Sequence, residues 1–384
     1  MNTSIDIQRM MSMAPRVRLG DVIETFDRRN EDDKDYPFYG INREKQFMSS
    51  VANTKNIEGN RYKVIYEGEF VFSGMQTGRD VCIRLGLFKE KFPVLLSPAY
   101  TLFRVKSGLE VSSDFIFILF LSNEKDRLGW FLSDASVRSN LDWERFCDIM
   151  IPLPSIEVQR EVVAVYEGLR QTAEQNEAMV EPLAKSCHAY IADCREKYPS
   201  VRLGGYITID EQVNREGKTY PFIGININKE FMPTSASTKD LDKKKYKVME
   251  KGKFVFSGMQ TGRDVSIRIG LYDKETPSLI SPAYTTFSIL ESKKKEILPE
   301  FLNMQFARKE ADRLGWFYSD SSVRSNLDWE RFCDIQIPLP PIEVQQAIVN
   351  LYHCSEEAKA IANEARNLMK TICPALVQKA AHSL

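Results

Sequence analysis

The feature that most constrains this chain is a long segment that occurs twice. Residues 126–159 read DRLGWFLSDASVRSNLDWERFCDIMIPLPSIEVQ, and residues 312–345 read DRLGWFYSDSSVRSNLDWERFCDIQIPLPPIEVQ. The two copies begin 186 residues apart, at 126 and 312. An internal repeat of this kind indicates that the chain is built from two similar units. Each copy ends in a short strand punctuated by proline and then opens a long helical pattern, so a globular unit leads into a helix twice.

The repeat extends over most of the chain. Residues 18–103 align with residues 202–287 at a constant offset of 184, from 18 to 202. Two residues are then inserted near residues 292–296, in a Lys- and Glu-rich segment where a solvated loop tolerates a length change. The repeat predicts an N-terminal arm at 1–16, a first globular unit at 17–154, a central helix at 155–198, a second globular unit at 199–340 and a C-terminal helix at 341–384.

Each globular unit mixes strand and helix patterns. In the first unit, residues 62–65 and 70–73 are rich in β-prone residues, and residues 81–87 interleave apolar and polar residues. Residues 115–121 fit a strand or a helix, but their counterpart 301–307 favours a helix. The expected fold class is therefore α+β, with two repeated α/β units and two long helices.

The two long helical patterns have heptad spacing, which is typical of a coiled-coil seam. The seam positions are Val162, Tyr166, Leu169, Ala173, Asn176, Val180, Leu183, Cys187, Tyr190 and Cys194, and then Val344, Ile348, Leu351, Ser355, Ala358, Ala362, Ala365, Met369, Ile372 and Leu376. We expect these helices to pack on each other in antiparallel directions and to relate the globular units by a pseudo-twofold axis. At 1.5 Å per residue, about 40 residues span roughly 60 Å, so the pair predicts a spacer. Pro182 and Pro374 should kink or interrupt the helices.

Composition excludes several classes of protein. With 43% hydrophobic and 27% charged residues the chain is typical of a soluble globular protein. Its longest apolar runs are too short to span a membrane, and its N-terminus does not resemble a secretory signal. We therefore expect a cytoplasmic protein without membrane contact.

The cysteines, histidines and net charge narrow the chemistry further. Seven cysteines without a Cys-x-x-Cys pair favour reduced thiols over disulfides or a zinc cage. Three histidines offer little for a metal site or a histidine base. A net charge of −1 argues against a uniformly basic nucleic-acid binder, so any DNA contact must come from local patches or from a partner.

The first candidate motif is FVFSGMQTGRDV, which is identical at residues 70–81 and 254–265. It suggests a strand followed by a Gly-rich turn that presents Gln, Thr and Arg. Glutamine can pair bidentately with adenine and arginine with guanine, and glycines let a backbone approach a polyanion closely. The structural alternative is a hairpin in which Gly74 and Gly78 supply positive φ angles while Arg79 and Asp80 are surface charges.

The second candidate motif is a hydroxyl-rich loop with one arginine, at residues 133–140 and 319–326. Such loops hydrogen-bond phosphates and base edges, although the same residues also form turns, and residues 140–142 could cap a following helix. The candidate DNA-contacting residues of the two motifs are Gln76, Thr77, Arg79, Ser136, Arg138, Asn140, Gln260, Thr261, Arg263, Ser322, Arg324 and Asn326.

Two other features carry less weight. The lysines at 243–245, 247, 251 and 253 resemble a phosphate-binding patch, but Lys251 and Lys253 align with Glu67 and Glu69, which favours a solvated face. Gly217-Lys218-Thr219 lacks the upstream glycine of a P-loop, since Gln212 stands there. We find neither a Rossmann fingerprint nor a nuclease motif, and predict no catalytic residue and no metal ligand.

Two globular units, each followed by I-P-L-P-x-I-E-V-Q and a heptad helix, resemble the specificity subunit of type I restriction-modification enzymes. The resemblance covers nearly the whole chain. Residues 337–345 match the motif fully, while Ser155 stands in the first copy where Pro341 stands in the second. In that family two target recognition domains are held apart by conserved antiparallel helices.

The resemblance implies a DNA reader without catalytic activity. Its expected partners are double-stranded DNA, two modification (methyltransferase) subunits and restriction subunits that translocate and cut DNA. S-adenosylmethionine, ATP and Mg²⁺ would be bound by those partner subunits, so no cofactor is expected in this chain. Family membership does not identify the base-reading residues, because recognition domains vary, so the residues named above come from the loop argument.

This chain departs from the family in that its two recognition domains are near copies. Because a twofold axis maps one DNA strand onto the other, similar domains should read similar half-sites in inverted orientation. The expected target is therefore bipartite and nearly palindromic. Two alternatives stay open at this point: a protein-interaction scaffold that does not bind DNA, and a fragment of a fused enzyme whose catalytic part lies elsewhere.

Overall fold

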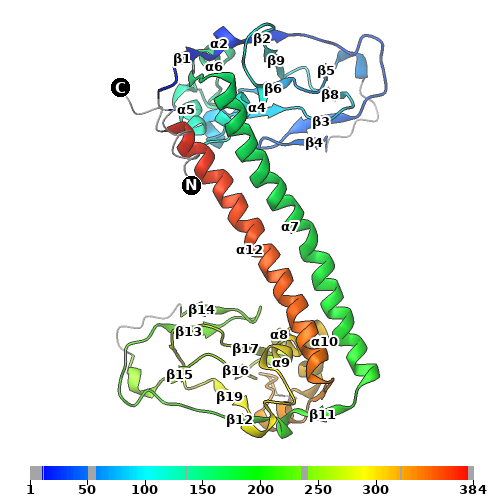
Figure 1. The fold of residues 1–384 in the computed structure, drawn as a ribbon, viewed down its shortest axis with the longest axis vertical. Helices are drawn as coiled ribbons and strands as arrows, with labels where there is room; N and C mark the ends of the chain where they lie inside the picture. Colours follow the sequence, from blue (N-terminus) through cyan, green and yellow to red (C-terminus); the bar gives the residue numbers. More distant parts are fainter. Residues whose placement is uncertain are drawn as a thin grey trace. The chain divides into compact units, whose positions relative to one another are not determined.

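The computed structural model describes residues 11, 13–50, 58–134, 136–234, 241–320 and 322–378. The predicted N-terminal arm lies largely outside these residues. By its internal contacts the chain divides into unit 1, which comprises Met1–Asn176 and Ala360–Leu384, and unit 2, which comprises Glu177–Lys359. Each unit consists of a globular head and parts of two long helices (Figure 1).

The head of unit 1 contains two four-stranded sheets. The first is antiparallel, in the order β2-β9-β6-β7. The second has the order β4-β3-β8-β5, in which β3 and β8 are parallel. A two-stranded ribbon of β1 and β10 joins the start of the head to its end. The strands are β1 (Arg16–Arg18), β2 (Ile23–Phe26), β3 (Phe38–Ile41), β4 (Phe47–Ser49), β5 (Lys63–Ile65), β6 (Phe70–Ser73), β7 (Arg84–Leu87), β8 (Val94–Leu96), β9 (Thr101–Val105) and β10 (Met150–Pro152).

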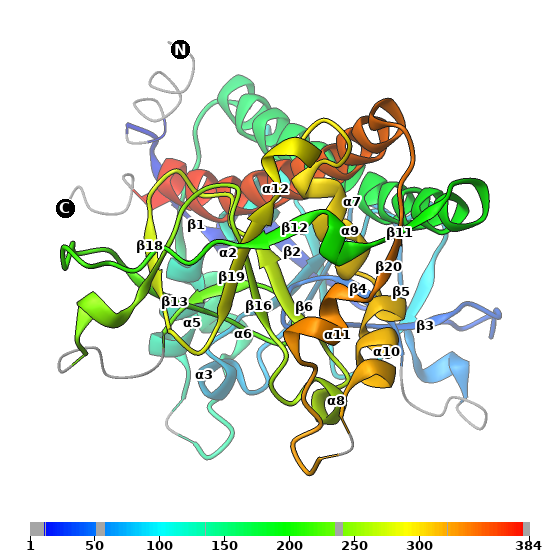
Figure 2. The same cartoon turned by 90° about the horizontal axis from the view of Figure 1, so that it is seen from below.

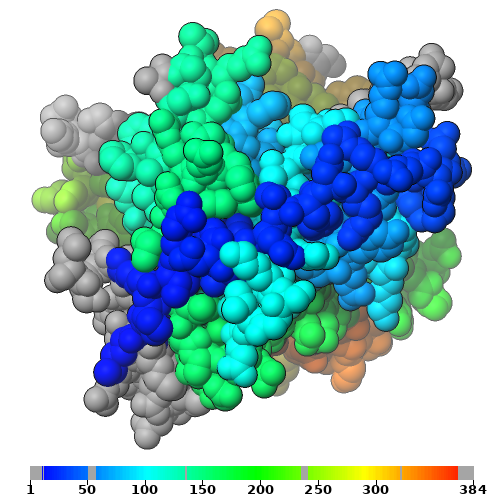
Figure 3. Space-filling model, turned by 90° about the horizontal axis from the view of Figure 1, so that it is seen from above, coloured from blue at the N-terminus to red at the C-terminus, as the bar shows by residue number. Residues whose placement is uncertain are grey.

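Short helices complete this head, and they bear out the mixed α+β expectation. The helices are α2 (Leu19–Val22), η1 (Gly59–Arg61), α3 (Thr77–Asp80), α4 (Ser113–Leu119), α5 (Asn123–Leu132) and α6 (Trp143–Cys147). The predicted helix at 115–121 is α4. The predicted strand at 81–87 begins only at Arg84, because Val81 still ends the helical turn of α3 in a left-handed conformation. In the space-filling view the N-terminal segment, coloured blue, forms a band across the surface of unit 1 (Figure 3).

The head of unit 2 repeats this topology strand for strand, with sheets β12-β19-β16-β17 and β14-β13-β18-β15 and a ribbon of β11 and β20. Its strands are β11 (Ser200–Arg202), β12 (Ile207–Ile209), β13 (Phe222–Ile225), β14 (Phe231–Pro233), β15 (Lys247–Met249), β16 (Phe254–Ser257), β17 (Arg268–Leu271), β18 (Ser278–Ile280), β19 (Thr285–Ile289) and β20 (Gln336–Pro338). Its helices are η2 (Leu203–Gly205), η3 (Lys243–Lys245), α8 (Thr261–Asp264), η4 (Glu291–Lys293), α9 (Pro299–Phe306), α10 (Lys309–Tyr318) and α11 (Trp329–Cys333).

Strand β6 separates two apolar cores, because successive side chains of a strand point to opposite faces. Phe70 and Phe72 join the core that the first sheet shares with the helices, where Phe72 stacks on Phe146 with centroids 4.3 Å apart. Val71 points the other way, into the core between the two sheets. Both faces of β6 are therefore buried, which explains its nearly continuous apolar sequence.

The long helices are α7 (Ile156–Lys197) and α12 (Ile342–Gln378). In unit 2, Cys187 Sγ lies 4.0 Å from the carbonyl oxygen of Ile348, and Ser355 Oγ donates to that of Val180 at 3.3 Å. Residue numbers that fall on one helix while they rise on the other show that the two segments are antiparallel, as predicted.

The seam prediction is largely confirmed, since Ala173, Ser355, Ala358, Ala362 and Ala365 are buried. At one position it is wrong. Tyr190 is 54% exposed, whereas its neighbour Ile191 is 1% exposed and packs in the core of unit 2. Where α7 packs against the head of unit 2, the buried face of the helix is therefore shifted by one residue from the heptad position. Helix α7 also runs through Pro182 without interruption.

A buried glutamine at the start of each long helix ties that helix to its own head. Gln159 is 0% exposed; its Oε1 accepts from Ser112 N at 2.9 Å, while its Nε2 donates to the carbonyl oxygens of Glu110 and Pro154. Gln345 makes the same three bonds to Leu298 N, Glu296 O and Pro340 O. The glutamine of the repeated motif is therefore a structural residue.

Candidate nucleic-acid interface

Two loops carry the residues singled out by the sequence. The first loop comprises residues 74–81 in unit 1 and 258–265 in unit 2, and the second comprises residues 133–142 and 319–328. Within the first loop, Gln76 has a left-handed backbone (φ 60°), α3 makes one helical turn, and Val81 (φ 49°) ends it in the left-handed region again. Gln260 and Val265 repeat these conformations with φ of 60° and 48°.

The glycines of the first loop do not have the role that the hairpin alternative gave them. Among the described residues, the positive-φ glycines are 68, 108, 217 and 252. At Gly74, however, an added Cβ would lie 1.7 Å from the carbonyl oxygen of Leu141, and at Gly78 it would lie 2.6 Å from Ser139 Cβ. The glycines are required because the second loop packs directly against the first.

Backbone hydrogen bonds join the two loops into one surface. Gly78 N donates to Ser139 O and Leu141 N donates to Gly74 O, both at 2.8 Å. Unit 2 repeats these bonds from Gly262 N to Ser325 O and from Leu327 N to Gly258 O, again at 2.8 Å. Figure 2 shows α8 and the loop before α11 side by side. Segments about sixty residues apart in sequence thus form one site in each head.

A side-chain contact completes the junction, because the Oδ1 of Asn140 accepts from the backbone N of Gln76 at 3.0 Å. Asn326 and Gln260 form the same bond at 3.0 Å. The amide of a left-handed residue would otherwise lack a partner inside the loop. Asn140 and Asn326 therefore position the first loop, and the amide nitrogen of each side chain is left to donate to DNA.

The second loop is shaped by one carboxylate. Oδ1 of Asp134 accepts hydrogen bonds from Ser136 Oγ, Ser136 N and Asn140 N, and the hydroxyl of Ser136 contributes most to lowering the pKa of Asp134. Asp142 then caps α6 by accepting from Arg145 N at 2.8 Å, as the turn-and-cap alternative predicted. Asp134 is engaged within the loop and Asp142 caps α6, so the exposed Arg138 is the charged side chain of this loop best suited to an anionic ligand.

The structure separates the predicted contact residues into two groups. Arg79, Ser136, Arg138, Arg263, Ser322 and Arg324 are exposed, and Gln76, Asn140, Gln260 and Asn326 are partly exposed. Thr77 and Thr261 are 0% exposed, and their hydroxyls donate to the carbonyl oxygens of Gly74 and Gly258. The prediction that these threonines face DNA is therefore corrected: they hold the first loop in shape.

The exposed groups of the first loop form a polar pair. Arg79 Nη2 donates to Gln76 Oε1 at 2.7 Å, and Arg263 does the same to Gln260. The side chain of Arg79 is 59% exposed and also lies 3.3 Å from the carboxylate of Asp80. A guanidinium and an amide held together at the surface can offer donors and an acceptor to base edges or phosphates.

An ion pair beneath each interface was missed by the sequence reasoning. The Nζ of Lys45 lies 2.8 Å from both carboxylate oxygens of Asp126, whose Oδ1 also accepts from Ile83 N at 2.9 Å. Lys229 and Asp312 repeat the pair in unit 2. The available clue was that both residues recur unchanged in the repeat. The pair anchors the turn between β3 and β4 to the helix α5.

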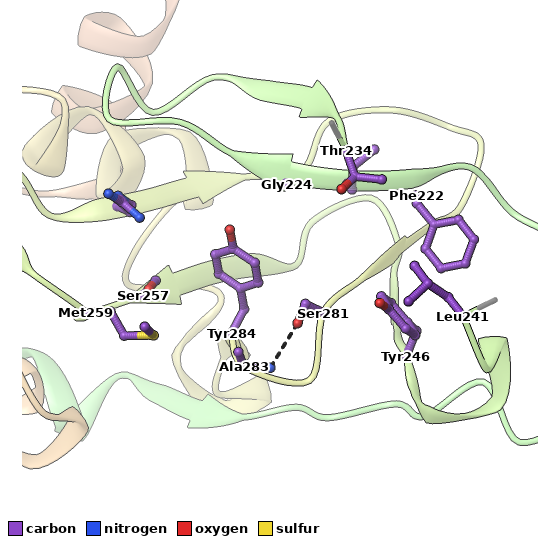
Figure 4. Close-up of a pocket in the computed structure, with 12 residues that line it drawn as sticks. Phe222, Gly224, Thr234, Leu241, Tyr246, Ser257, Met259, Ser281, Ala283 and Tyr284 are labelled. Atoms are coloured by element: carbon purple, nitrogen blue, oxygen red, sulfur yellow. Dashed lines mark hydrogen bonds between the residues drawn. The ribbon is translucent and has the colours of Figure 1, made fainter. Parts of the chain in front are cut away.

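A cleft of about 370 Å³ adjoins the first loop of unit 2. Figure 4 shows Tyr284, Tyr246, Phe222 and Met259 around it, and Arg268 also lines it. The dashed line in that view is the bond from Ala283 N to Ser281 Oγ, 3.3 Å. Aromatic rings and a guanidinium beside a polar loop suit contact with a nucleic acid.

The lysine-rich segment is a solvated face in part: Lys244, Lys245 and Lys251 are exposed as expected, but two other lysines are buried. Lys247 is 7% exposed and donates to Glu211 and to the carbonyl oxygen of Tyr284, while Lys253 is 9% exposed and donates to Gln212. Lys243, Lys244 and Lys245 form the short helix η3. Two of the lysines are thus internal supports of the head, because their charges have partners there.

Within the described part of the chain, His, Cys, Asp and Glu side chains form no group of three or more suited to a metal ion. No helix in that same part is both long and apolar enough to cross a membrane.

Comparison with known proteins bears on both heads. A family model described as "Type I restriction modification DNA specificity domain" matches residues 15–178 and 203–359. The solved structure of a type I restriction-modification system S subunit from M. genitalium is similar, with a TM-score of 0.59 at 12% identity, covering 94% of this chain and 96% of that one. The HsdS subunit from Thermoanaerobacter tengcongensis gives a TM-score of 0.43 at 18% identity, over 95% and 96% of the two chains. No curated protein matches. At 12% identity the M. genitalium likeness demonstrates a shared fold.

Proposed function

Since the chain belongs to the family of type I restriction-modification DNA specificity domains, we propose that each head reads one half of a bipartite DNA site. The family assignment confirms the resemblance found in the sequence, and with it the specificity role. The finer proposal is that the two half-sites are nearly identical and inverted. Modification and restriction subunits would carry S-adenosylmethionine, ATP and Mg²⁺ and perform adenine methylation and cleavage in the cytoplasm, while this chain supplies recognition.

One observation carries the proposal. Both heads hold the same outward-facing side chains on the same two loops, joined by the same hydrogen bonds at the same distances. Equivalent surfaces of equal geometry should select equal bases, because direct readout depends on where donors and acceptors are placed. Two domains on one face of a duplex would read half-sites about one helical turn apart, roughly 34–36 Å between centres.

The test is to map methylated adenines in cells that express this chain with its modification subunit. The expected result is one interrupted, nearly palindromic motif whose recognition is lost when the unspecific spacer changes length. Two unrelated half-sites would show that residues differing between the heads contact the bases. Absence of any sequence-dependent binding by the assembled complex would favour the protein-interaction scaffold.

A further inference from the structure

Beside the first loop, the two heads differ by one unit of charge, because an arginine in one turn has no basic counterpart in the other. The turn between β3 and β4 carries Arg43 in unit 1, and the equivalent turn between β13 and β14 carries Ile227. Arg43 is exposed, and its Nη2 donates to the carbonyl oxygen of Asp80, at the end of α3, at 3.0 Å. Ile227 is 54% exposed. A guanidinium thus lies next to the first loop of unit 1, while an apolar side chain stands at the equivalent position beside the first loop of unit 2.

The backbone of this turn is held in the same way in both heads. Cys82 Sγ donates to the carbonyl oxygen of Arg43 at 3.2 Å, and Ser266 Oγ donates to that of Ile227 at 2.9 Å. The Lys45–Asp126 pair and its counterpart anchor the next residues of each turn. Position 43 and position 227 are therefore equivalent sites that differ in side chain alone.

Arg43 is not needed to shape the loop that it contacts. Helix α8 forms the same single turn beside Ile227 as α3 forms beside Arg43, with flanking φ angles of 60° and 48° against 60° and 49°. Since the loop folds equally well without a guanidinium at its end, maintaining the loop does not account for the arginine. Its exposed position at the end of the first loop, beside Asp80, points to a contact outside the chain.

The charge balance around each loop differs by one unit because of this residue. In unit 1 the carboxylate of Asp80 binds Arg84 at 2.5 Å and Arg79 at 3.3 Å, and Arg43 adds a third guanidinium. In unit 2 the carboxylate of Asp264 pairs with the counterparts of the first two, Arg268 at 2.6 Å and Arg263 at 3.3 Å, and Ile227 stands where Arg43 does. Each turn also carries one exposed acid, Glu44 or Glu230, so these acids leave the difference unchanged.

We propose that Arg43 binds a DNA phosphate in the half-site read by unit 1, and that unit 2 makes no equivalent contact. The two heads would then read the same bases with unequal affinity. A phosphate contact adds binding free energy and salt dependence without adding sequence information, so the methylated motif would stay symmetric. This inference rests on the proposed function.

The experiment uses the complete complex with its modification subunits and a duplex carrying the mapped site. Binding is measured between about 50 and 300 mM salt for the wild type, Arg43→Ile, Ile227→Arg and the double exchange. The slope of log affinity against log salt is negative, and its absolute value is compared among the variants. Loss of one phosphate contact should lower this slope by about 0.9 and weaken binding about five-fold at 0.15 M salt. Ile227→Arg should raise the slope by a similar amount, and the double exchange should restore the wild-type slope.

Glu44→Asn is the matched control, because it introduces the unit 2 residue at the neighbouring position of the same turn. It should not lower the slope. Unchanged slopes for both Arg43→Ile and Ile227→Arg would overturn the phosphate contact while specific binding, and hence the proposed function, persists. If the wild-type complex binds cognate and scrambled DNA equally, the proposed function itself fails.

Discussion

Residues 23–29 of unit 1 read IETFDRR, whereas the equivalent residues 207–213 of unit 2 read ITIDEQV, so that only the first position is shared. Residues 70–81 and 254–265, by contrast, are identical. If a recent duplication alone explained the likeness of the heads, differences would be spread evenly. The differences lie in several segments, among them the edge strands β2 and β12 and residues 104–125 with their counterparts 288–311, whereas residues 70–81 are unchanged. This pattern indicates that the first loop has been held constant while the supporting structure changed.

At this edge of each head, a buried charged residue is held by different partners in the two units. In unit 1, Arg28 donates two hydrogen bonds of 2.8 Å to Glu69, and this carboxylate is the main cause of a raised pKa at Arg28. In unit 2 the equivalent of Glu69 is Lys253, which donates to Gln212 at 2.9 Å and to Asp210 at 3.4 Å. The sign of the charges is reversed, yet each buried group keeps a partner. A support can be rebuilt in several ways, whereas an interface for a fixed ligand cannot.

The strongest way to break the equivalence of the heads is Gly74→Ala. Its new Cβ would overlap the carbonyl oxygen of Leu141, so the two loops of unit 1 should separate at a cost of about 3 kcal/mol or more. Recognition of one half-site should be lost, as measured by binding to the mapped site. Gly68→Ala is the control, because Gly68 also lies in unit 1 but has only a positive φ and no atom within 4 Å. Full binding by Gly74→Ala would contradict the close packing of the loops.

A comparable loss of stability is expected when the buried glutamine that ties a long helix to its head is replaced. Gln159→Leu and Gln345→Leu each leave a partly buried backbone N–H and two carbonyl groups without their partner, which should destabilise the affected unit by about 1–3 kcal/mol. Thermal unfolding measures this, and the two variants should behave alike. Gln346→Leu is the neighbouring control, since its exposed amide contacts only Asn350 among the described residues. Equal melting temperatures for all three variants would argue against the junction.

Removing the exposed guanidinium of a single head sharpens the comparison of the reading loops. Arg79→Ala and Arg263→Ala should each reduce discrimination between cognate and scrambled half-sites by about 1–3 kcal/mol, if each arginine contacts a base bidentately. Competition binding with the two DNAs gives the value. Arg61→Ala, in which an arginine 78% exposed and paired with Glu58 is lost, should leave discrimination unchanged. Retained discrimination in both loop variants would leave the first loop with a purely structural role.

The smallest effect is expected when the support of unit 2 is transplanted into unit 1. The triple exchange Phe26→Asp, Arg28→Gln and Glu69→Lys gives the new lysine the partners that Lys253 has, although it removes the packing of Phe26 on the core between the sheets. It should therefore lose less stability than Glu69→Lys made alone. Glu69→Lys alone places a second positive charge beside Arg28 and should cost more. Chemical denaturation compares the two. A triple exchange less stable than the single one would show that the supports are not interchangeable.

Much of the fold was predictable because it depends on local pattern or on repetition. The heptad spacing identified the long helices and most of their buried seam, and the repeat identified two heads of the same α+β class. The error at Tyr190 arose because a heptad describes helix packing alone, whereas Ile191 there faces the head of unit 2. The lysines at 247 and 253 were misjudged because their acceptors Glu211 and Gln212 lie in the segment after β12, far away in the sequence.

The candidate site was predictable in composition but not in construction. Both loops were identified from the polar residues that recur in the repeat. The sequence did not reveal that the two loops pack against each other. Without that contact, Gly74 was interpreted as a turn residue and Thr77 as a DNA-contacting residue. A contact between residues about sixty positions apart leaves no periodic trace in the sequence, so the reason for each glycine appears only when its neighbour is known.

The close packing of the two loops also constrains how this surface can be engineered. Leu141 packs directly on Gly74, and Asn140 accepts the hydrogen bond from the backbone N of Gln76. The conformation of each loop therefore depends on the other loop. A graft of residues 74–81 onto another scaffold would import side chains without the template that orients them. Residues 74–81 and 133–142 form the smallest transplantable module, and libraries that vary one of these segments must vary the other with it.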